Sequence, residues 1–339
     1  MTALSVVIIS KNQEWNIARL IESLLAETDL SSREIVLVDS ASIDKTVEIA
    51  RNYPIDIIRL HPEQRLTAAV GRYVGYHHTT GERILFLDGD MELRSGWLTQ
   101  AMAIMDNQED VAVVTGQSID ISSPDERTIR LAEAPTSCAG TATEVLHGGG
   151  AALYRRSVLE QVGTFHPYIY SDEEPELCVR IRYAGYRILR LEYPMVFHFS
   201  SPRNNVSTLV ARRRRNLWVG SGQNMRYHLH TGLLWPYMKE RGHGIIPGIG
   251  ITAGLVSLLW SVITRRWGWF GLWLWLVAGV LAGDAYRKRN LYLTFSSLVK
   301  RIFIFEGMVR GFLMKPMHPE DYPIQFDLVS VPTQRRVYE

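Results

Sequence analysis

The sequence predicts an α/β fold with a mainly parallel sheet and flanking helices, followed by C-terminal membrane-associated helices. Short runs rich in Val and Ile alternate with helical patterns in the first part of the chain, and polar residues directly follow several of these runs. A later stretch, residues 245–283, is almost free of charged side chains. Strand–helix alternation is typical of parallel sheets, because each crossover returns over one face of the sheet.

The N-terminal part of the chain repeats a strand–helix unit. Buried parallel strands read as continuous apolar runs, whereas helices place apolar residues three and four positions apart. Strands are expected at residues 5–9, 34–38, 55–60, 83–87 and 111–115, and helices at residues 15–27, 44–53 and 66–78. Residues 148–154 predict a small-residue loop that enters another strand, and residues 174–184 predict a helix that ends at Gly185.

The composition is that of an ordinary globular protein. A net charge of +2 and 46% hydrophobic residues exclude a disordered chain and a protein that coats nucleic acid. The two cysteines, Cys138 and Cys178, form no pattern of a metal cluster or a disulfide framework. The N-terminal run lacks the basic flank of a secretory signal. We therefore expect the globular part to face the cytoplasm.

Two carboxylates follow the fourth predicted strand on a tight turn. Asp88-Gly89-Asp90 comes directly after the apolar run ILFL, at the edge where ligands of such sheets bind. Oxygen ligands of this kind suit Mg²⁺ or Mn²⁺, which can neutralise the charge that builds on a leaving diphosphate. A solvated turn is the alternative, since Asp and Gly are common turn residues. The preceding strand and the polar ends of the other strands favour the metal site.

Polar side chains also end the first two predicted strands. Asn12 follows the first strand and Asp39 ends the second. A carboxylate at Asp39 can accept a hydrogen bond from the imide N–H of a uracil base. Asp44 and Thr46 are better explained as caps of the following helix. We therefore expect Asp39 to bind a ligand.

Six segments in residues 5–188 carry a family resemblance. In chain order they are SVVIISKNQEWNI, VDSASIDKT, AAVGRYVG, ERILFLDGDM, GGGAALYRRSVLEQVGTF and EEPELCVRIRYAGYRI. Together, and at these separations, they resemble the inverting family 2 glycosyltransferases with a GT-A fold. The resemblance implies a Rossmann-like catalytic domain that uses a divalent metal and a nucleotide-sugar donor, with UDP favoured over GDP or dTDP.

The resemblance also implies roles for individual residues. Asp39 would bind the nucleobase, and Arg72 would approach the diphosphate. Asp88 would contact the ribose or the metal, and Asp90 would bind the metal. The complete implied nucleotide-sugar site consists of Asn12, Glu14, Asp39, Arg72, Asp88, Gly89 and Asp90.

An acidic run, DEEPE, resembles the family's general-base motif. Alignment on the following leucine places Glu174 at the position of the base, where the family usually carries Asp, and leaves Glu173 and Asp172 as alternatives. Inverting transfer needs a carboxylate that takes the proton from the acceptor hydroxyl, opposite the leaving diphosphate. For Asp172 and Glu176 we favour local roles, at the positive end of the helix and in an ion pair with Arg180.

Two further features resemble family positions. His198, in the run MVFHF, matches a histidine near the metal or the diphosphate, although a structural buried histidine is an equal alternative. Gly148, Gly149 and Gly150 match the loop on the acceptor side, where small residues let a substrate approach the backbone, and a plain turn is the alternative.

The charge-free stretch predicts association with a membrane. Residues 245–264 suffice to cross a hydrocarbon core of about 30 Å, whereas residues 267–283 are shorter and rich in Trp. If both segments cross, Arg265 and Arg266 lie on the outer side, against the positive-inside tendency, so a re-entrant hairpin remains an alternative. Residues 291–313 predict an amphipathic helix at the interface, with packing in a soluble core as the alternative.

A basic tract, RRRR at residues 212–215, precedes the apolar stretch and is followed by Trp218. Four arginines suit anionic headgroups or the phosphate of a lipid-linked acceptor, whereas a solvated cationic face is the alternative. The chain lacks the Gln-x-x-Arg-Trp signature of processive family members, so we expect transfer of a single sugar.

These expectations combine into one domain plan and one function. Residues 1–230 form the GT-A catalytic domain, residues 231–315 a membrane-associated helical region, and residues 316–339 a C-terminal tail. The enzyme is expected to transfer a sugar, at the cytoplasmic side of a membrane, to a lipid-linked saccharide or glycolipid in cell-envelope or polysaccharide synthesis. One alternative is a polyprenyl-phosphate sugar synthase. Another, of a different class, is a non-catalytic membrane scaffold with a degenerate transferase fold.

Overall fold

The computed structural model describes residues 3–27, 33–121, 141–199 and 205–330. The chain divides into two compact units, one of Met1–Ser201 with Met317–Glu339 and one of Pro202–Pro316. The sequence-based plan instead placed the end of the first domain at residue 230 and treated residues 316–339 as a tail. In the structure, β10 (Phe326–Ser330) lies in the first unit as an edge strand of the sheet.

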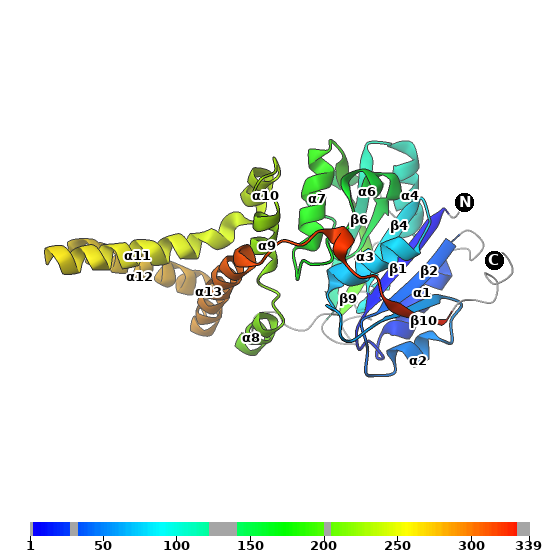
Figure 1. Cartoon of the computed structure of the whole chain (residues 1–339), viewed down its shortest axis with the longest axis horizontal. Coiled ribbons are helices and arrows are strands. Elements are labelled where there is room, and N and C mark those ends of the chain that lie inside the picture. Colours follow the sequence, from blue (N-terminus) through cyan, green and yellow to red (C-terminus); the bar gives the residue numbers. More distant parts are fainter. Residues whose placement is uncertain (1–2, 28–32, 122–140, 200–204, 331–339) are drawn as a thin grey trace. The chain divides into compact units, whose positions relative to one another are not determined.

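The first unit is built on one sheet, to which ten of the described strands belong (Figure 1). Its parallel core has the order β3-β2-β1-β4, formed by β1 (Leu4–Ser10), β2 (Arg33–Asp39), β3 (Asp56–Leu60) and β4 (Arg83–Asp88). β10 pairs antiparallel with β3 at one edge. On the other side the order continues through β8 (Ala152–Arg155), β6 (Val111–Ile121), β9 (Arg187–Phe199) and β5 (Met91–Leu93), while β7 (Ala142–Glu144) pairs with β9.

The α/β fold expected from the sequence is confirmed, and the sheet is mixed. The expected parallel arrangement holds for β1 to β4 and for the pair of β6 and β9, whereas β8 lies antiparallel to both of its neighbours. Mixed sheets, in which an antiparallel strand lies beside a parallel core, are common.

Helices cover both faces of the sheet. One face packs against α1 (Ile17–Glu27), α2 (Thr46–Ala50) and α4 (Trp97–Asn107), and the other against α3 (Ala68–His78), α6 (Arg156–Val162) and α7 (Glu173–Tyr183). β1 shows the reason, because Val6 and Ile8 face the first cluster while Val7 and Ile9 face the second. A strand buried on both faces needs apolar side chains at every position.

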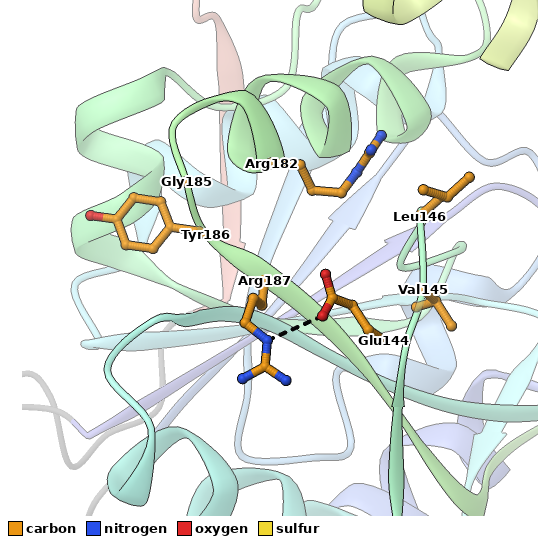
Figure 2. A pocket seen from close by; sticks show the side chains of 7 residues that line it. All are labelled: Glu144, Val145, Leu146, Arg182, Gly185, Tyr186 and Arg187. Atoms are coloured by element: carbon orange, nitrogen blue, oxygen red, sulfur yellow. Dashed lines mark hydrogen bonds and ion pairs between the residues drawn. The ribbon is translucent and has the colours of Figure 1, made fainter. Parts of the chain in front are cut away.

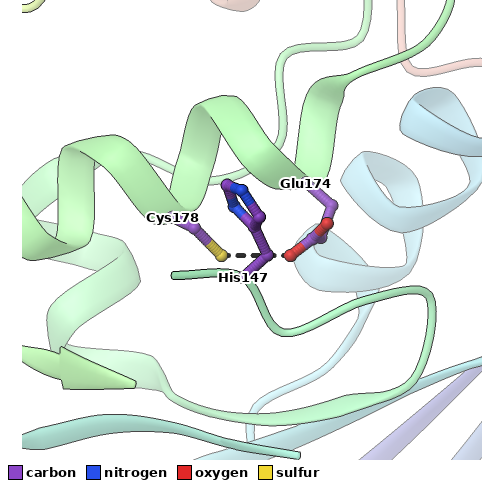
Figure 3. A group of neighbouring side chains, drawn as sticks. All are labelled: His147, Glu174 and Cys178. Atoms are coloured by element: carbon purple, nitrogen blue, oxygen red, sulfur yellow. Dashed lines mark hydrogen bonds between the residues drawn. The ribbon is translucent and has the colours of Figure 1, made fainter. Parts of the chain in front are cut away.

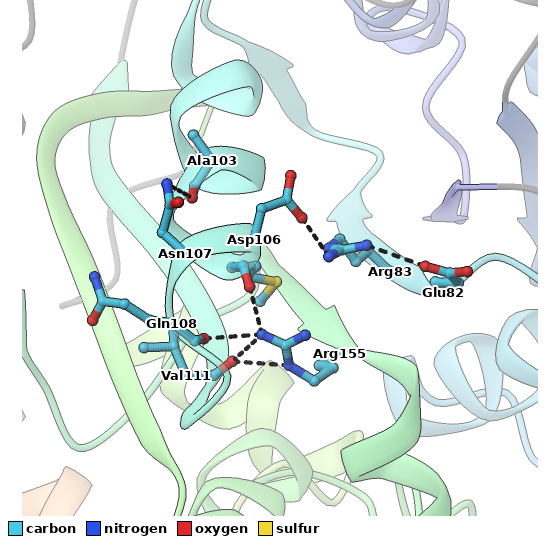
Figure 4. A network of polar contacts seen from close by, with 9 residues as sticks. Glu82, Arg83, Ala103, Asp106, Asn107, Gln108, Val111 and Arg155 are labelled. Carbon is cyan, nitrogen blue, oxygen red and sulfur yellow. Dashed lines mark hydrogen bonds and ion pairs between the residues drawn. The ribbon is translucent and has the colours of Figure 1, made fainter.

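Two local features hold the helices close to the sheet. A Cβ on Gly75 of α3 would lie 2.2 Å from Cγ1 of Val7, so the helix reaches β1 only because this residue has no side chain. On the opposite side of the unit, Arg155 of β8 donates to the backbone carbonyls of Met105, Gln108 and Val111 (Figure 4). This arginine satisfies carbonyls at the end of α4, where no further helical N–H follows.

The second unit is helical. It contains α8 (Val206–Arg214), α9 (Gly220–Tyr227), α10 (Leu234–Arg241), η2 (Gly242–Gly244), α11 (Ile245–Thr264), α12 (Gly268–Lys288) and α13 (Leu291–Leu313). α9 and α13 approach backbone to backbone, since a Cβ on Gly222 would lie 1.9 Å from the carbonyl oxygen of Met308. Arg213 of α8 adds an ion pair with Glu306 of α13 at 3.1 Å.

Two apolar helices of this unit are candidates for membrane anchoring. The segments Leu234–Thr264 and Gly268–Lys288 have the length and composition to cross a bilayer, and no residue of α12 is buried. α11 and α12 lie side by side (Figure 1), and Trp273 donates to the carbonyl of Gly250 at 2.9 Å. The exposed side chains are mostly Leu, Val, Ile and Trp, as expected for surfaces that contact lipid.

Candidate active site

The Asp88-Gly89-Asp90 turn lies at the carboxyl end of β4 and is held by its backbone. Gly89 donates from its N–H to the carbonyl of Ile9 at 2.8 Å. Asn16, which is 1% exposed, donates from Nδ2 to the carbonyls of Gly89 at 3.0 Å and Met91 at 2.7 Å. The turn is therefore fixed to β1 and to the start of α1, and its carboxylates project from a rigid backbone.

His198 lies beside the second carboxylate of this turn. β5 and β9 pair with Met91 opposite His198, and Nε2 of His198 lies 3.4 Å from Oδ2 of Asp90. Nδ1 of the same ring lies 2.8 Å from Oδ1 of Asp120 on β6. The hydrogen bond to Asp90 raises the pKa of His198, with a further contribution from Asp120. Sequence reasoning missed Asp120, because only the pairing of β6 with β9 brings it to the histidine.

Oδ1 of Asp90 is buried and has no hydrogen-bond partner among the described residues. Carboxylate oxygens and an imidazole nitrogen are ligands for a divalent cation. A buried carboxylate oxygen without a donor is costly unless a cation or another donor reaches it. Asp90 and His198 therefore form a donor pair that suits a divalent metal, and Asp88 lies on the same turn with one oxygen bound by Arg72.

Arg72 connects the turn to the acidic run of the sequence. From α3, it donates to Oε1 of Glu173 at 2.6 Å and to Oδ1 of Asp88 at 2.7 Å, and it is only 3% exposed. Burial raises the pKa of both carboxyl groups, and the guanidinium opposes this shift. A third contact, at 3.4 Å, reaches the carbonyl of Gly150. Arg72 thus joins three sequence-predicted segments and is shielded from solvent.

Glu173 and Glu174 lie in the first turn of α7, and their side chains have different partners. Oε1 of Glu174 accepts from the N–H groups of Gly148 at 2.7 Å and Gly149 at 2.9 Å, and from Sγ of Cys178 at 3.1 Å. Its other oxygen accepts no hydrogen bond from a described residue. One oxygen of Glu174 therefore holds the glycine loop.

A further group surrounds Glu174. The ligand atoms of His147, Glu174 and Cys178 lie within 4.8 Å of one another (Figure 3). Burial raises the pKa of the Cys178 thiol well above its usual range, which keeps it protonated and able to donate to Glu174. Neither His147 nor a role for Cys178 was foreseen from the sequence. A cysteine one helical turn after the predicted base was the available signal.

Asn12 and Glu14, which were also predicted from the sequence, join the loop after β1 to the loop after β2. The backbone N–H of Asn12 donates to Oγ of Ser42 at 2.8 Å, and Oδ1 of Asn12 accepts from the N–H of Ile43 at 2.9 Å. Oε2 of Glu14 accepts from the N–H of Lys45 at 3.0 Å. Asn12 and Glu14 therefore hold the ends of β1 and β2 together.

Asp39 is fully buried at the end of β2. Its Oδ2 accepts from the N–H of Ser42 at 2.9 Å, and Nε of Arg59 lies 3.8 Å away. Burial raises the pKa of Asp39, and the hydrogen bonds from Ser42 oppose this. Oδ1 has no hydrogen-bond partner among the described residues, which leaves an acceptor for an N–H donor.

One cavity among the described residues lies away from these groups. It has a volume of about 530 Å³ and is lined by the end of α7, the start of β9 and the segment after β7 (Figure 2). Arg187 on its wall pairs with Glu144 and Asp110, each at 3.2 Å. None of the residues predicted for the site from the sequence lines this cavity.

The fold and the acidic turn at the end of β4 have a match among protein families. Residues 5–163 match the family described as Glycosyl transferase family 2. The chain carries a family 2 glycosyltransferase domain. This match covers β1 to β8 together with Asp39, Arg72, Asp88 and Asp90, so the GT-A family resemblance seen in the sequence is confirmed.

Curated relatives of this glycosyltransferase domain are distant. The pre-mycofactocin glycosyltransferase of Mycobacterium tuberculosis is 25% identical over 280 residues, which are 77% of this chain and 56% of the relative. The 4,4'-diaponeurosporenoate glycosyltransferase of Staphylococcus haemolyticus is 26% identical over 104 residues, which are 30% of this chain and 27% of the relative. The chain thus spans little more than half the length of the first and about a quarter of the second.

Solved structures share the GT-A fold. A mannosyltransferase from Pyrobaculum calidifontis in complex with GDP-Man and Mn²⁺ has a TM-score of 0.56 and 18% identity, over 91% of this chain and 87% of that one. TarS 1–349 of S. aureus in complex with UDP-GlcNAc has a TM-score of 0.51 and 17% identity, over 91% and 90%. At identities this low, the likeness shows that the fold is shared and no more.

Proposed function

We propose that this glycosyltransferase transfers a single sugar, with inversion, from a nucleotide-sugar donor to a hydroxyl group of a membrane-resident acceptor. The observation that carries the proposal is the arrangement around Arg72, which joins Asp88 of the metal-binding turn to Glu173 beside the proposed base. The reaction needs a metal at the leaving diphosphate and a base at the acceptor, and this arginine fixes the two sites relative to each other.

The donor would bind across the carboxyl ends of β1, β2 and β4. Oδ1 of Asp39, buried without a described partner, would accept the imide N–H of a uracil base, so a UDP-sugar is the favoured donor. Solved structures of the same fold contain GDP-Man or UDP-GlcNAc, which supports a nucleotide sugar as the class. Asn12 and Glu14 would act indirectly, by holding the loops around the base.

Asp90, Asp88 and His198 would hold Mg²⁺ or Mn²⁺. The metal, when bound, neutralises charge on the departing diphosphate. Asp120 would orient the histidine through Nδ1, so that Nε2 faces the metal, and such outer partners commonly tune metal sites. Arg72 would act on the diphosphate through Asp88, because its guanidinium is already bound to two carboxylates.

Glu174 would be the general base. The ion pair with Arg72 occupies one oxygen of Glu173 at 2.6 Å, so this carboxylate is committed to the buried guanidinium. Glu174 uses Oε1 to hold Gly148 and Gly149 and keeps Oε2 for the acceptor hydroxyl. The same carboxylate would thus shape the acceptor loop and take the proton.

An acceptor in the bilayer would explain the apolar helices. The donor is soluble in water, so an anchor brings the enzyme to its acceptor rather than to its donor. A lipid-linked saccharide or a glycolipid suits this, with the catalytic unit at the cytoplasmic face. Arg214 and Arg215, which precede the apolar helices in the chain, would meet anionic headgroups.

The test uses purified full-length protein in lipid vesicles. A panel of UDP-, GDP- and dTDP-sugars is incubated with lipid extract, with Mn²⁺ or with a chelator, and nucleotide release is measured together with sugar transfer. We expect release that requires metal and lipid acceptor, and a loss of about 10²- to 10⁴-fold in Glu174→Gln. Glu160→Gln, an exposed residue of α6, is the matched control.

Other outcomes separate the alternatives. Near-normal turnover by Glu174→Gln and Glu173→Gln would favour a polyprenyl-phosphate acceptor, which needs less base catalysis. Transfer to a soluble sugar without any dependence on lipid would contradict the membrane-resident acceptor. If no nucleotide sugar is turned over with any acceptor, a non-catalytic scaffold is the better description.

A further inference from the structure

The segment that follows the helical unit returns to the catalytic unit. We name residues 317–330 the C-terminal strap. It contains η3 (Pro319–Asp321) and β10, which pairs antiparallel with β3 with Phe326 opposite Leu60. Between the two elements lies Tyr322, which is 5% exposed although the segment around it is largely exposed. A buried aromatic residue in an otherwise exposed segment indicates a specific docking contact.

Tyr322 contacts two loops of the catalytic unit. Its hydroxyl lies 3.3 Å from Oε1 of Gln64 and 3.3 Å from the carbonyl oxygen of Arg65. Its ring packs edge-on against Tyr73 of α3, with centroids 6.0 Å apart, and against Tyr168, at 5.6 Å. Burial raises the pKa of Tyr322 to about 12, so the hydroxyl remains a donor at all physiological pH values.

Two hydrogen bonds from side chains to backbone carbonyls also hold the C-terminal strap. Tyr168 donates from its hydroxyl to the carbonyl of Asp321 at 2.8 Å, and Gln64 donates from Nε2 to the carbonyl of Gln325 at 3.0 Å. The strap is therefore bound on both sides of Tyr322, once to the loop before α3 and once to the loop before α7.

Arg65 joins the same two loops directly. It donates from a guanidinium N–H to the carbonyl of Tyr168, and its guanidinium lies over the rings of Tyr168, at 5.5 Å, and Tyr170, at 4.5 Å. Cation–π contacts of this kind fix both the ring and the backbone that carries it. Tyr322 donates from its hydroxyl to the carbonyl of Arg65.

The loop that these contacts hold leads into the proposed catalytic helix. Asp172, the last residue before α7, has φ of 66°, in the left-handed region that is unfavourable for a residue with a side chain. Such a conformation persists only where the surroundings fix it. Glu173 and Glu174 follow directly, so the direction of their side chains depends on this backbone.

We infer that the C-terminal strap positions the catalytic helix, with Tyr322 and Arg65 as positioning residues that act on Glu173 and Glu174 through the loop of residues 165–172. The inference rests on the proposed function for the roles of the two glutamates. Its consequence is that the catalytic unit is completed only by chain that follows the apolar helices. Loss of the docking contact should impair transfer more than donor binding, because Asp39 and Asp90 belong to other loops.

The test compares Tyr322→Ala, Tyr322→Phe and a control, Leu328→Ala, in the full-length protein. Leu328 lies on β10 with 51% exposure, away from the hydrogen bonds and ring contacts that hold the two loops. In Tyr322→Ala we expect faster amide hydrogen exchange in residues 165–174 and a fall in kcat of about tenfold or more, with KM for the donor changed less than about twofold. Tyr322→Phe, which keeps the ring, should retain most of the activity, and Leu328→Ala should match the parent.

Normal exchange in residues 165–174 of Tyr322→Ala, or an unchanged kcat, would overturn the inference. Fast exchange throughout the sheet would also overturn it, in favour of a general stabilising role. Tyr168→Phe, which removes only the hydrogen bond to Asp321, gives the milder version of the same test and should loosen residues 165–174 alone. The exchange measurements need no substrate, so they remain decisive even if the parent protein turns over no nucleotide sugar.

Discussion

Arg72 and Asp88 form an ion pair of 2.7 Å in which the arginine is almost completely shielded from water. A second carboxylate, from Glu173, completes the environment of the guanidinium at 2.6 Å. Two acids of a proposed active site thus share one buried cation. Removal of the cation leaves two negative charges without compensation, one buried and one partly buried, which is more costly than removal of a complete pair.

Replacement of Arg72 by Met should therefore destabilise the catalytic unit. We expect the free energy of unfolding to fall by about 3 kcal/mol at neutral pH, reduced somewhat by the partial exposure of Asp88. Urea denaturation measures this change in the free energy of unfolding. A variant with Arg187→Met is the control and should lose little stability, because Arg187 is partly exposed and both of its carboxylate partners, Asp110 and Glu144, are exposed.

The loss should depend on pH with a definite sign. Burial already raises the pKa of Asp88 and Glu173, and removal of the opposing guanidinium raises both pKa values further. A group with a raised pKa in the folded state contributes its stability below its unfolded pKa and loses it as the pH rises through the folded pKa. The difference between Arg72→Met and the parent should be smallest in acid and grow as the pH rises above about 4. An equal difference at all pH values would contradict the proposed coupling.

Substitution of His198 should weaken metal binding. His198→Ala removes one proposed ligand, and Asp120→Asn removes the carboxylate that orients it, so we expect losses in Mn²⁺ affinity of about 10- to 100-fold in each. Calorimetric titration with Mn²⁺ and activity as a function of Mn²⁺ concentration measure the effect. His77→Ala, whose ring contacts the carbonyl of Tyr73, should bind Mn²⁺ like the parent. Parent-like affinity in His198→Ala would exclude the histidine from the metal site.

Gly149 should not tolerate a side chain without loss of activity. Its φ is 79° and a Cβ added there would meet nothing within 4 Å, so the cost of Gly149→Ala comes from the backbone alone, about 1 kcal/mol. The loop would move away from Glu174, and we expect slower transfer together with a fall in melting temperature of about 2 to 4 °C. Gly250→Ala on α11, where a Cβ also meets nothing within 4 Å, is the control and should have parent-like activity.

Charge in the apolar helices should release the protein from lipid. Leu255→Arg and Leu276→Arg each place a charge at an exposed position near the middle of its helix, which costs about 2.5 to 3.5 kcal/mol at the centre of a bilayer-spanning helix. The affinity for vesicles, measured by co-sedimentation, should therefore fall by about 100-fold for each substitution. Leu255→Ala and Leu276→Ala are the matched controls. Unchanged binding by both Arg variants would show that these helices do not enter the bilayer.

The sequence by itself determined the fold class and the principal acids of the site. Apolar runs such as residues 5–9 are local signals, and the acids that follow them lie at one edge of the sheet because parallel strands end there. Asp39, Asp88 and Asp90 were predicted in this way. The two apolar helices were likewise read from composition, since a run without charges needs no tertiary context.

Only the tertiary structure decided which side chains meet. The pairing of Arg72 with Glu173, of His198 with Asp120 and of Tyr322 with the loops before α3 and α7 joins residues far apart in the chain. No local pattern encodes such contacts, because they depend on strand order and on how the helices pack over the sheet. Two features of the sheet could not be predicted from the sequence for the same reason, namely its mixed strand direction and the pairing of β10 with β3. An apolar run shows that a strand is buried, whereas its neighbour in the sheet depends on the rest of the fold.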